Sequence, residues 1–308
     1  MPRQELDAAR ERAFDVSYRM LGSVRDAEDV GQEAMLRLAR ADRPIDEPVA
    51  WVTTVATRLS IDHLRRARVR RETYVGPWLP EPLVVESEPG PADRADVAEA
   101  VSQALLVVLE RLSPLERAAF LLREAFGYEY AEIATIIGRR EASCRQLVAR
   151  ARKHVQENRP RFEPDLGLRR RLLEDFLAAA EDGDVARLER TLADDAVFYA
   201  DGGGNVPASR HPLVGANRIA RAVVAVVRAQ RRRSGLEHLP VTVNGQPGAL
   251  RLTDDGALLD VLAVDVADGR IQAVRIMRNP DKLAHLWARG WRPQGAAAPG
   301  GREARRTR

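Results

Sequence analysis

The sequence predicts a multidomain protein with two all-α units, a helical bundle and a helix-turn-helix, followed by a C-terminal α+β unit. Apolar residues recur with helical spacing from about Asp7 to Arg71 and again from about Ala95 to Asn158. Farther along, runs rich in β-branched residues alternate with Gly and Asp turns. Proline-rich stretches separate the three regions and mark the expected boundaries.

Composition limits the classes of function. The 308 residues are 45% hydrophobic and 31% charged, enough for two or three compact units, and the formal net charge is only +4. Any nucleic-acid surface must therefore come from clustering of basic residues on particular helices. Without an apolar run of the ~20 residues that a membrane span needs, or a signal peptide, we expect a cytoplasmic protein and no membrane partner. The single cysteine, Cys144, and five scattered histidines argue against a disulfide and a metal site. No cofactor is expected.

The first unit is expected over residues 5–73, with three or four helices. Asp29, Gln32 and Glu33 stand three and four residues apart, so they share one helical face. The pattern places an apolar set on the inward face, namely Val30, Ala34, Met35, Leu36 and Leu38. Solvent exposure alone explains such an acidic face, and so does the basic surface of a partner protein.

A basic helix follows in the segment WVTTVATRLSIDHLRRARVRRE. Its arginines outnumber its one aspartate, Asp62, and include Arg58, Arg65, Arg66 and Arg68. This charge suits a nucleic-acid surface, and Trp51 near the start could support an unstacked base. Trp51 could equally belong to the core.

The segment from residue 74 to 95 is rich in proline, as a linker should be. Its first half nevertheless carries Trp78, Leu79, Leu83 and Val84, which a solvated spacer does not need. These apolar side chains should be buried against something in the free protein.

The second helical unit, expected over residues 96–158, contains the strongest local signal. Tyr130–Ile137 predicts a short helix, Gly138 permits a turn, and a longer helix starts at Glu141, which is helix-turn-helix spacing. An earlier helix should begin at Ser113-Pro114, with the serine as its cap. On the longer helix Cys144, Leu147 and Val148 face inward.

The outward face of that helix is basic and carries the residues predicted to read DNA. Arg145 and Gln146 are placed for bases or adjacent phosphates. Phosphate contacts are expected from Arg140, Arg150 and Arg152. The alternative is a solvated basic helix in an ordinary bundle.

The α+β unit is expected over residues 165–290. One helix, Arg170 to Ala193, should precede about four strands, and Asp201 with three following glycines reads as a turn at a strand end. Residues 291–308 have the composition of a disordered tail.

Together these parts resemble a bacterial extracytoplasmic-function (ECF) sigma factor of the sigma-70 family. The segment LGSVRDAEDVGQEAMLRLAR is similar to the polymerase-binding helix of sigma domain 2, and the basic helix to its promoter-melting and minus-10-reading part. The helix-turn-helix is similar to sigma domain 4, which reads the minus-35 element. The resemblance implies that Asp29, Gln32 and Glu33 contact core RNA polymerase and that the two basic helices bind promoter DNA.

The remainder resembles a SnoaL-like domain, which implies a cone-shaped α+β barrel. The sigma-factor subgroup with this extension has three sequence signatures, and the chain carries all of them: Trp78, Leu79, Pro80, Glu81 and Pro82; Asp201, Gly202, Gly203 and Gly204; and Asn279, Pro280, Asp281, Lys282 and Leu283. Asn205 stands where the subgroup usually has lysine. The resemblance implies that this domain regulates in cis through an intramolecular contact with the sigma domains and replaces a separate anti-sigma protein.

Two other functions stay open at this point. A one-component DNA-binding regulator could combine the helix-turn-helix with a small-molecule-sensing SnoaL-like domain. An unknown small ligand is compatible with this regulator and with the sigma factor. A SnoaL-like enzyme could use Asp201, Asp260 or Asp265 as acid or base. For the linker, the alternatives are a local apolar cluster closing over the last helix of the first domain, or a segment clamped by the SnoaL-like domain when silent and laid along polymerase when active.

Overall fold

The computed structural model describes residues 2–71, 74–85, 102–158, 165–287, 290 and 292–293. The chain divides into two compact units. The first comprises residues 1–83, 89–164 and the short turn 244–246, and the second comprises 84–88, 165–243 and 247–308. Each unit is described separately below.

The first unit begins with three helices, α1 (Arg3–Leu21), α2 (Val24–Ala39) and α3 (Pro48–Arg71), as the helical periodicity predicts. Gly22 ends α1 in the left-handed region with φ of 65°, and the Ser23 side chain accepts a hydrogen bond from the Asp26 amide at the start of α2. One expectation about the core is wrong. Leu36 is 49% exposed because it lies on the outer side of α2.

Among the described residues, four further helices follow in the same unit: α5 (Gln103–Leu109), α6 (Pro114–Glu124), α7 (Tyr130–Ile137) and α8 (Glu141–Asn158). Ser113 and Glu116 form a capping box at the start of α6, with Pro114 in its first turn, which confirms that predicted helix start. Gly138, with φ of 66°, makes the turn between α7 and α8. The predicted helix-turn-helix is therefore present.

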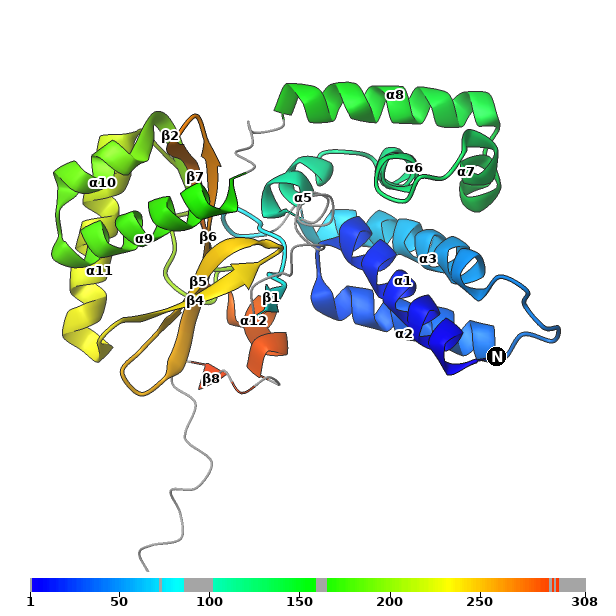
Figure 1. Cartoon of the computed structure of the whole chain (residues 1–308), viewed down its shortest axis with the longest axis horizontal. Coiled ribbons are helices and arrows are strands. Elements are labelled where there is room, and N and C mark those ends of the chain that lie inside the picture. Colours follow the sequence, from blue (N-terminus) through cyan, green and yellow to red (C-terminus); the bar gives the residue numbers. More distant parts are fainter. Residues whose placement is uncertain are drawn as a thin grey trace, which may run out of the picture. The chain divides into compact units, whose positions relative to one another are not determined.

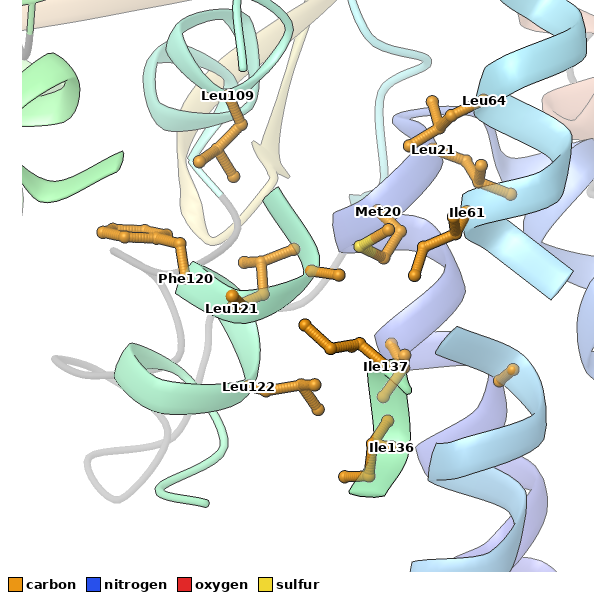
Figure 2. Packing of buried hydrophobic residues seen from close by; sticks show 14 of the residues in the cluster. Met20, Leu21, Ile61, Leu64, Leu109, Phe120, Leu121, Leu122, Ile136 and Ile137 are labelled. Carbon is orange, nitrogen blue, oxygen red and sulfur yellow. The ribbon is translucent and has the colours of Figure 1, made fainter. Parts of the chain in front are cut away.

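The helices on both sides of the linker share one hydrophobic core (Figure 2). Met20 of α1 and Ile61 of α3 belong to the same buried cluster as Leu121 of α6 and Ile136 of α7. The sequence predicts separate helical units, and the structure packs them together because the apolar faces of α3, α6 and α7 complete one another.

The second unit is α+β, as predicted. Its helices are α9 (Leu166–Asp182), α10 (Val185–Thr191), α11 (Ala216–Ser234) and α12 (Pro280–Trp287). The single helix expected from Arg170 to Ala193 is wrong. Gly183 ends α9 with φ of 72°, Asp184 caps α10, and the chain continues as a strand from Leu192.

The sheet has more strands than the four expected. The part of the chain that the structure describes supplies eight strands: β1 (Val84–Val85), β2 (Leu192–Asp201), β3 (Leu213–Val214), β4 (Glu237–Val243), β5 (Gln246–Leu252), β6 (Ala257–Ala267), β7 (Arg270–Met277) and β8 (Arg292–Pro293). The order is β1-β4-β5-β6-β7-β2-β3, with β8 pairing β6 and with β2 and β7 parallel. Helices α9, α10 and α11 cover one face of the sheet (Figure 1).

The last described residues of the linker join this sheet. Val84 and Val85 form β1, which pairs antiparallel with Val243 and Thr242 of β4. Residues 86–95 of the expected linker, and residues 291 and 294–308 of the expected disordered tail, lie outside the described residues. The tail prediction is wrong for Arg292 and Pro293, which form β8 and pair with β6. Within the described part of the chain, no helix is long and apolar enough to cross a membrane.

Candidate nucleic-acid and partner interfaces

The outer face of α8 is basic and open to solvent. The residues predicted to read DNA from this helix are all exposed: Arg140, Arg145, Gln146, Arg150 and Arg152. Cys144, Leu147 and Val148 are buried on the opposite side, as predicted. The helix therefore presents the predicted set of donors on one face.

Several of these arginines, themselves exposed, have partners in the same unit. Arg145 pairs with Glu141 and lies 4.4 Å from the ring centroid of Tyr130. Arg152 pairs with Glu124 at 2.7 Å and Arg150 with Glu116 at 3.1 Å. Exposed ion pairs contribute little to stability, so phosphates can displace these partners at small cost.

The basic helix α3 is only partly open. Arg65 and Arg66 are exposed, with Arg65 3.1 Å from Asp62, and Trp51 is half-buried against the core. The side chain of Arg68 lies outside what the structure describes.

Arg58 of α3 is exposed and also has partners within the first unit. Its guanidinium donates hydrogen bonds to two backbone carbonyls at the end of α7, Ile136 at 2.8 Å and Thr135 at 2.9 Å. The last carbonyls of a helix have no partner within it and carry the negative end of its dipole. Arg58 thus caps the first helix of the helix-turn-helix.

The predicted acidic face lies on α2. Asp29 and Gln32 are exposed, and Glu33 pairs with Arg37 at 2.7 Å. The exposed Leu36 lies three and four residues from Glu33 and Gln32, so it shares their face. The sequence pattern alone predicts a core position for this leucine, so it does not predict that Leu36 belongs to the acidic face of α2.

Glu81 of the linker is a buried carboxylate that completes the start of α2. Its Oε2 accepts from the backbone amides of Val24 at 2.7 Å and Arg25 at 3.3 Å, and its Oε1 accepts from Ser23 Oγ at 2.9 Å. A negative charge is favoured at a helix N-terminus, where amides have no intrahelical acceptor. The cap of α2 is therefore supplied by the linker.

The linker backbone also contacts the end of α1. The Glu81 amide donates to the Gly22 carbonyl at 2.8 Å, and Tyr18 Oη donates to the Glu81 carbonyl at 2.7 Å. Leu79 is buried, and a Cβ added to Gly22 would lie 3.0 Å from the Trp78 ring. The described contacts of this motif therefore fall on the junction of α1 and α2.

Arg117 of α6 is a buried cation that the sequence did not single out. Its Nη1 donates to the Met20 carbonyl at 2.6 Å and to Glu110 Oε1 at 2.8 Å. Burial lowers the pKa of Arg117 to about 9, which still leaves the guanidinium charged at neutral pH. This side chain joins α6 to the end of α1, and only the three-dimensional structure reveals the pairing.

Two of the three sequence signatures meet inside the second unit. Asp201, at the end of β2, is fully buried and lies 2.7 Å from Lys282 Nζ of α12. The Asp201 carbonyl accepts from the amides of Arg278 at 2.8 Å and Asn279 at 2.9 Å. We call Asp201–Asn205 and Asn279–Lys282 the clasp.

Glycine is required within the clasp. Gly203 has φ of 60°, and a Cβ there would lie 2.1 Å from Nδ2, the side-chain amide nitrogen of Asn279. Asn205, in the position where the subgroup usually has lysine, donates to Asn279 at 3.1 Å and to Asp281 at 2.9 Å. The glycines make the turn predicted at the strand end, and the asparagine closes it on α12.

None of the three aspartates considered as acid or base is free. Asp260 is buried and accepts two hydrogen bonds from Arg251, Asp265 pairs with Arg275, and Asp201 pairs with Lys282. Carboxylates held by cations in this way serve as counter-ions. The arrangement favours a structural role for all three.

Comparisons with known proteins identify both helical regions of the first unit. Residues 7–70 match the model of sigma-70 region 2, and residues 102–155 match sigma-70 region 4. The chain is 37% identical to the ECF RNA polymerase sigma factor SigJ of Mycobacterium tuberculosis, over 91% of this chain and 92% of that protein. It is 35% identical to the probable ECF RNA polymerase sigma factor SigI of the same species, over 91% and 94%.

The similarity extends to the structure. A crystal structure of M. tuberculosis SigJ matches with a TM-score of 0.72 and 33% identity, over 92% of this chain and 98% of that one. The two matched regions make the protein a sigma factor of the sigma-70 type. More narrowly, the chain belongs to the ECF RNA polymerase sigma factors, and its C-terminal unit is the SnoaL-like part of such a chain. As a sigma factor it directs transcription initiation.

Proposed function

We propose that the acidic face of α2 binds core RNA polymerase and that α3 and α8 bind promoter DNA. The exposed carboxylate and amide of Asp29 and Gln32, beside Leu36, offer polar and apolar contacts together, as protein interfaces do. Arg140, Arg145 and Gln146 are exposed at the start of α8, where a recognition helix reaches base edges. Polymerase does the chemistry, and this chain supplies recognition.

We further propose that the described form of the first unit is a closed, silent state. The observation that carries this is the position of Arg58. A side chain expected to contact DNA is instead used to cap α7, and α3, α6 and α7 share buried apolar residues. Binding the two promoter elements at once requires the minus-10-reading and minus-35-reading helices to separate, which the proline-rich linker permits at ~3.3 Å per extended residue.

The SnoaL-like unit is proposed to control this opening in cis. The linker supports the proposal because its WLPEP part is bound on the first unit through Glu81, while Val84 and Val85 belong to the sheet of the second unit. A change in the second unit can therefore act on the segment that caps α2. The clasp links β2 to α12 and thereby stabilises the fold of the second unit.

In vitro transcription from a cognate promoter tests the regulation. The full chain, a chain ending at Pro164, a chain ending at Arg278 and the Trp78→Ala variant are compared with the same core polymerase. Both truncations and the substitution should change promoter activity. Arg221→Gln, an exposed change on α11, is the matched control and should leave it unaltered. Indifference of transcription to all three changes would refute regulation in cis and leave the sigma-factor function standing.

A further inference from the structure

The SnoaL-like unit contains a cavity that the sigma-factor function does not use. Its volume is about 530 Å³, within the range of small-molecule sites. The walls are largely apolar and come from α9, α11 and the sheet, with Phe176, Phe198, Val223, Leu262 and Ile276 among them. Such a space can enclose the hydrocarbon part of a small molecule.

The lining of the cavity includes guanidinium groups. Arg251 and Arg278 line it, and both lie on the carboxylate of Asp260, Arg251 through two hydrogen bonds and Arg278 with its Nε 3.4 Å from Oδ2. Two guanidinium groups thus share one carboxylate. Among the described residues that line the cavity, none is an aspartate or glutamate, so a positive charge remains uncompensated beside apolar walls.

Arg278 still has hydrogen-bonding capacity. Its Nη1 donates to the Pro207 carbonyl at 2.8 Å and its Nε lies beside Asp260, while 21% of the side chain stays exposed. The planar guanidinium fork matches a carboxylate, and its hydrogen bonds to an ionised acceptor are stronger than those to a neutral one. The accessible part of the Arg278 side chain therefore favours an anionic group.

The other titratable groups do not cancel this charge. His238 lines the cavity and contacts Glu181, which also pairs with Arg231 at 3.0 Å. Burial lowers the pKa of His238, so the imidazole is neutral near pH 7. Arg233, exposed at the end of α11, adds a further cation to the lining.

We propose that this cavity binds a small apolar organic acid, with its carboxylate on Arg278 and Arg251 and its hydrocarbon part between α9, α11 and the sheet. Arg251, Arg278, Arg233 and the neutral His238 fix the orientation, and the walls exclude water from the apolar part. Binding of such an acid does not depend on regulation in cis, so the two proposals stand or fall separately.

Displacement of a fluorescent anion from the full chain tests the proposal. The probe is 1-anilinonaphthalene-8-sulfonate, and the competitors are decanoate and 2-naphthoate, each with its neutral amide. We expect a single saturable site from which at least one acid displaces the probe. The matching amide should bind roughly ten-fold or more weakly, because a hydrogen bond to a charged group contributes at least that factor.

Three variants locate the site. Arg278→Gln should weaken the acid by roughly ten-fold or more, and Arg278→Lys should restore part of the affinity because it keeps the charge. Ala222→Trp, which places a large ring in the lining, should abolish displacement. Arg221→Gln removes an exposed charge from the same helix outside the lining and should change nothing.

Thermal melting of each variant confirms that it is folded before binding is compared. Equal affinity for acid and amide, no displacement by either acid, or unchanged affinity in folded Arg278→Gln or Ala222→Trp would each overturn the proposal.

Discussion

Glu81 binds the start of α2 with both carboxylate oxygens, and this single side chain gives the first prediction. Glu81→Ala would leave the buried Ser23 hydroxyl and Val24 amide without their acceptor. The free energy of unfolding of the first unit should fall by about 1–3 kcal/mol. Urea denaturation measures it. Glu28→Ala, an exposed change on the same helix, is the control and should have an effect within about 0.5 kcal/mol.

The buried ion pair of the clasp gives a second prediction at the residue scale. Lys282→Met leaves the fully buried Asp201 carboxylate without its cation, so the second unit should lose about 3–5 kcal/mol of stability. The double variant with Asp201→Asn should recover part of that loss, because the uncompensated charge is gone. Thermal unfolding of the full chain compares the two. A single variant as stable as the parent would show that the pair contributes nothing.

Sequence reasoning at this scale worked where neighbours along the chain decide the outcome. The outward set on α8, the buried Cys144 and the turn after Asp201 all follow from helical or turn periodicity, and the structure confirms them. The roles of Glu81 and Arg117 do not follow from it. Their partners lie 57 and 97 residues away, and a distance of that kind leaves no periodic signal in a single sequence.

At the scale of elements, the packing of α3 on α7 gives a third prediction. Arg58→Ala removes two hydrogen bonds to the carbonyls that end α7. At about 1 kcal/mol for each bond, the amides in the last turn of α7 should exchange with solvent roughly ten-fold faster or more. Hydrogen–deuterium exchange of the full chain measures this, and Arg65→Ala on the same helix is the control. Equal exchange in both variants would argue against the cap.

The elements of the second unit show where pattern reading fails. The expected long helix breaks at Gly183 because glycine takes the left-handed conformation there at no steric cost. Helix α11 was not identified, although its apolar residues recur at helical spacing along one side. Strand pairing between β2 and β7 joins segments far apart in sequence, so the sheet order had to come from the structure.

For the whole molecule, the shared core of the first unit implies a measurable opening. Labels at Glu28→Cys on α2 and Glu157→Cys on α8, in a Cys144→Ala background, report the distance between the two helical modules. Energy transfer should fall when core polymerase binds, because α3 and α8 must then reach separate promoter elements. Unchanged transfer in a complex that transcribes would rule out the closed state as the silent one. Wild-type activity of the unlabelled double-cysteine variant is the control.

The sequence predicts the order of the helical and α+β units and the family they resemble. It does not predict that the two helical modules pack together. Residues such as Ile61 and Ile136 read as core positions of their own helices, and nothing in the pattern distinguishes a core within one module from a core shared by two. That distinction depends on long-range contacts, which a single sequence does not reveal.

The cap on α2 has a consequence for how signals travel through this chain. Because the helix proposed to bind polymerase is completed by a carboxylate from the linker, occupancy of the helix face and position of the linker are linked equilibria. Linkage is reciprocal. If release of the linker from α1 and α2 changes the affinity for polymerase by some factor, then polymerase binding changes the equilibrium constant for linker release by the same factor. Titrations of core polymerase against the parent chain and against Glu81→Gln would measure how much the Glu81 carboxylate contributes to that coupling.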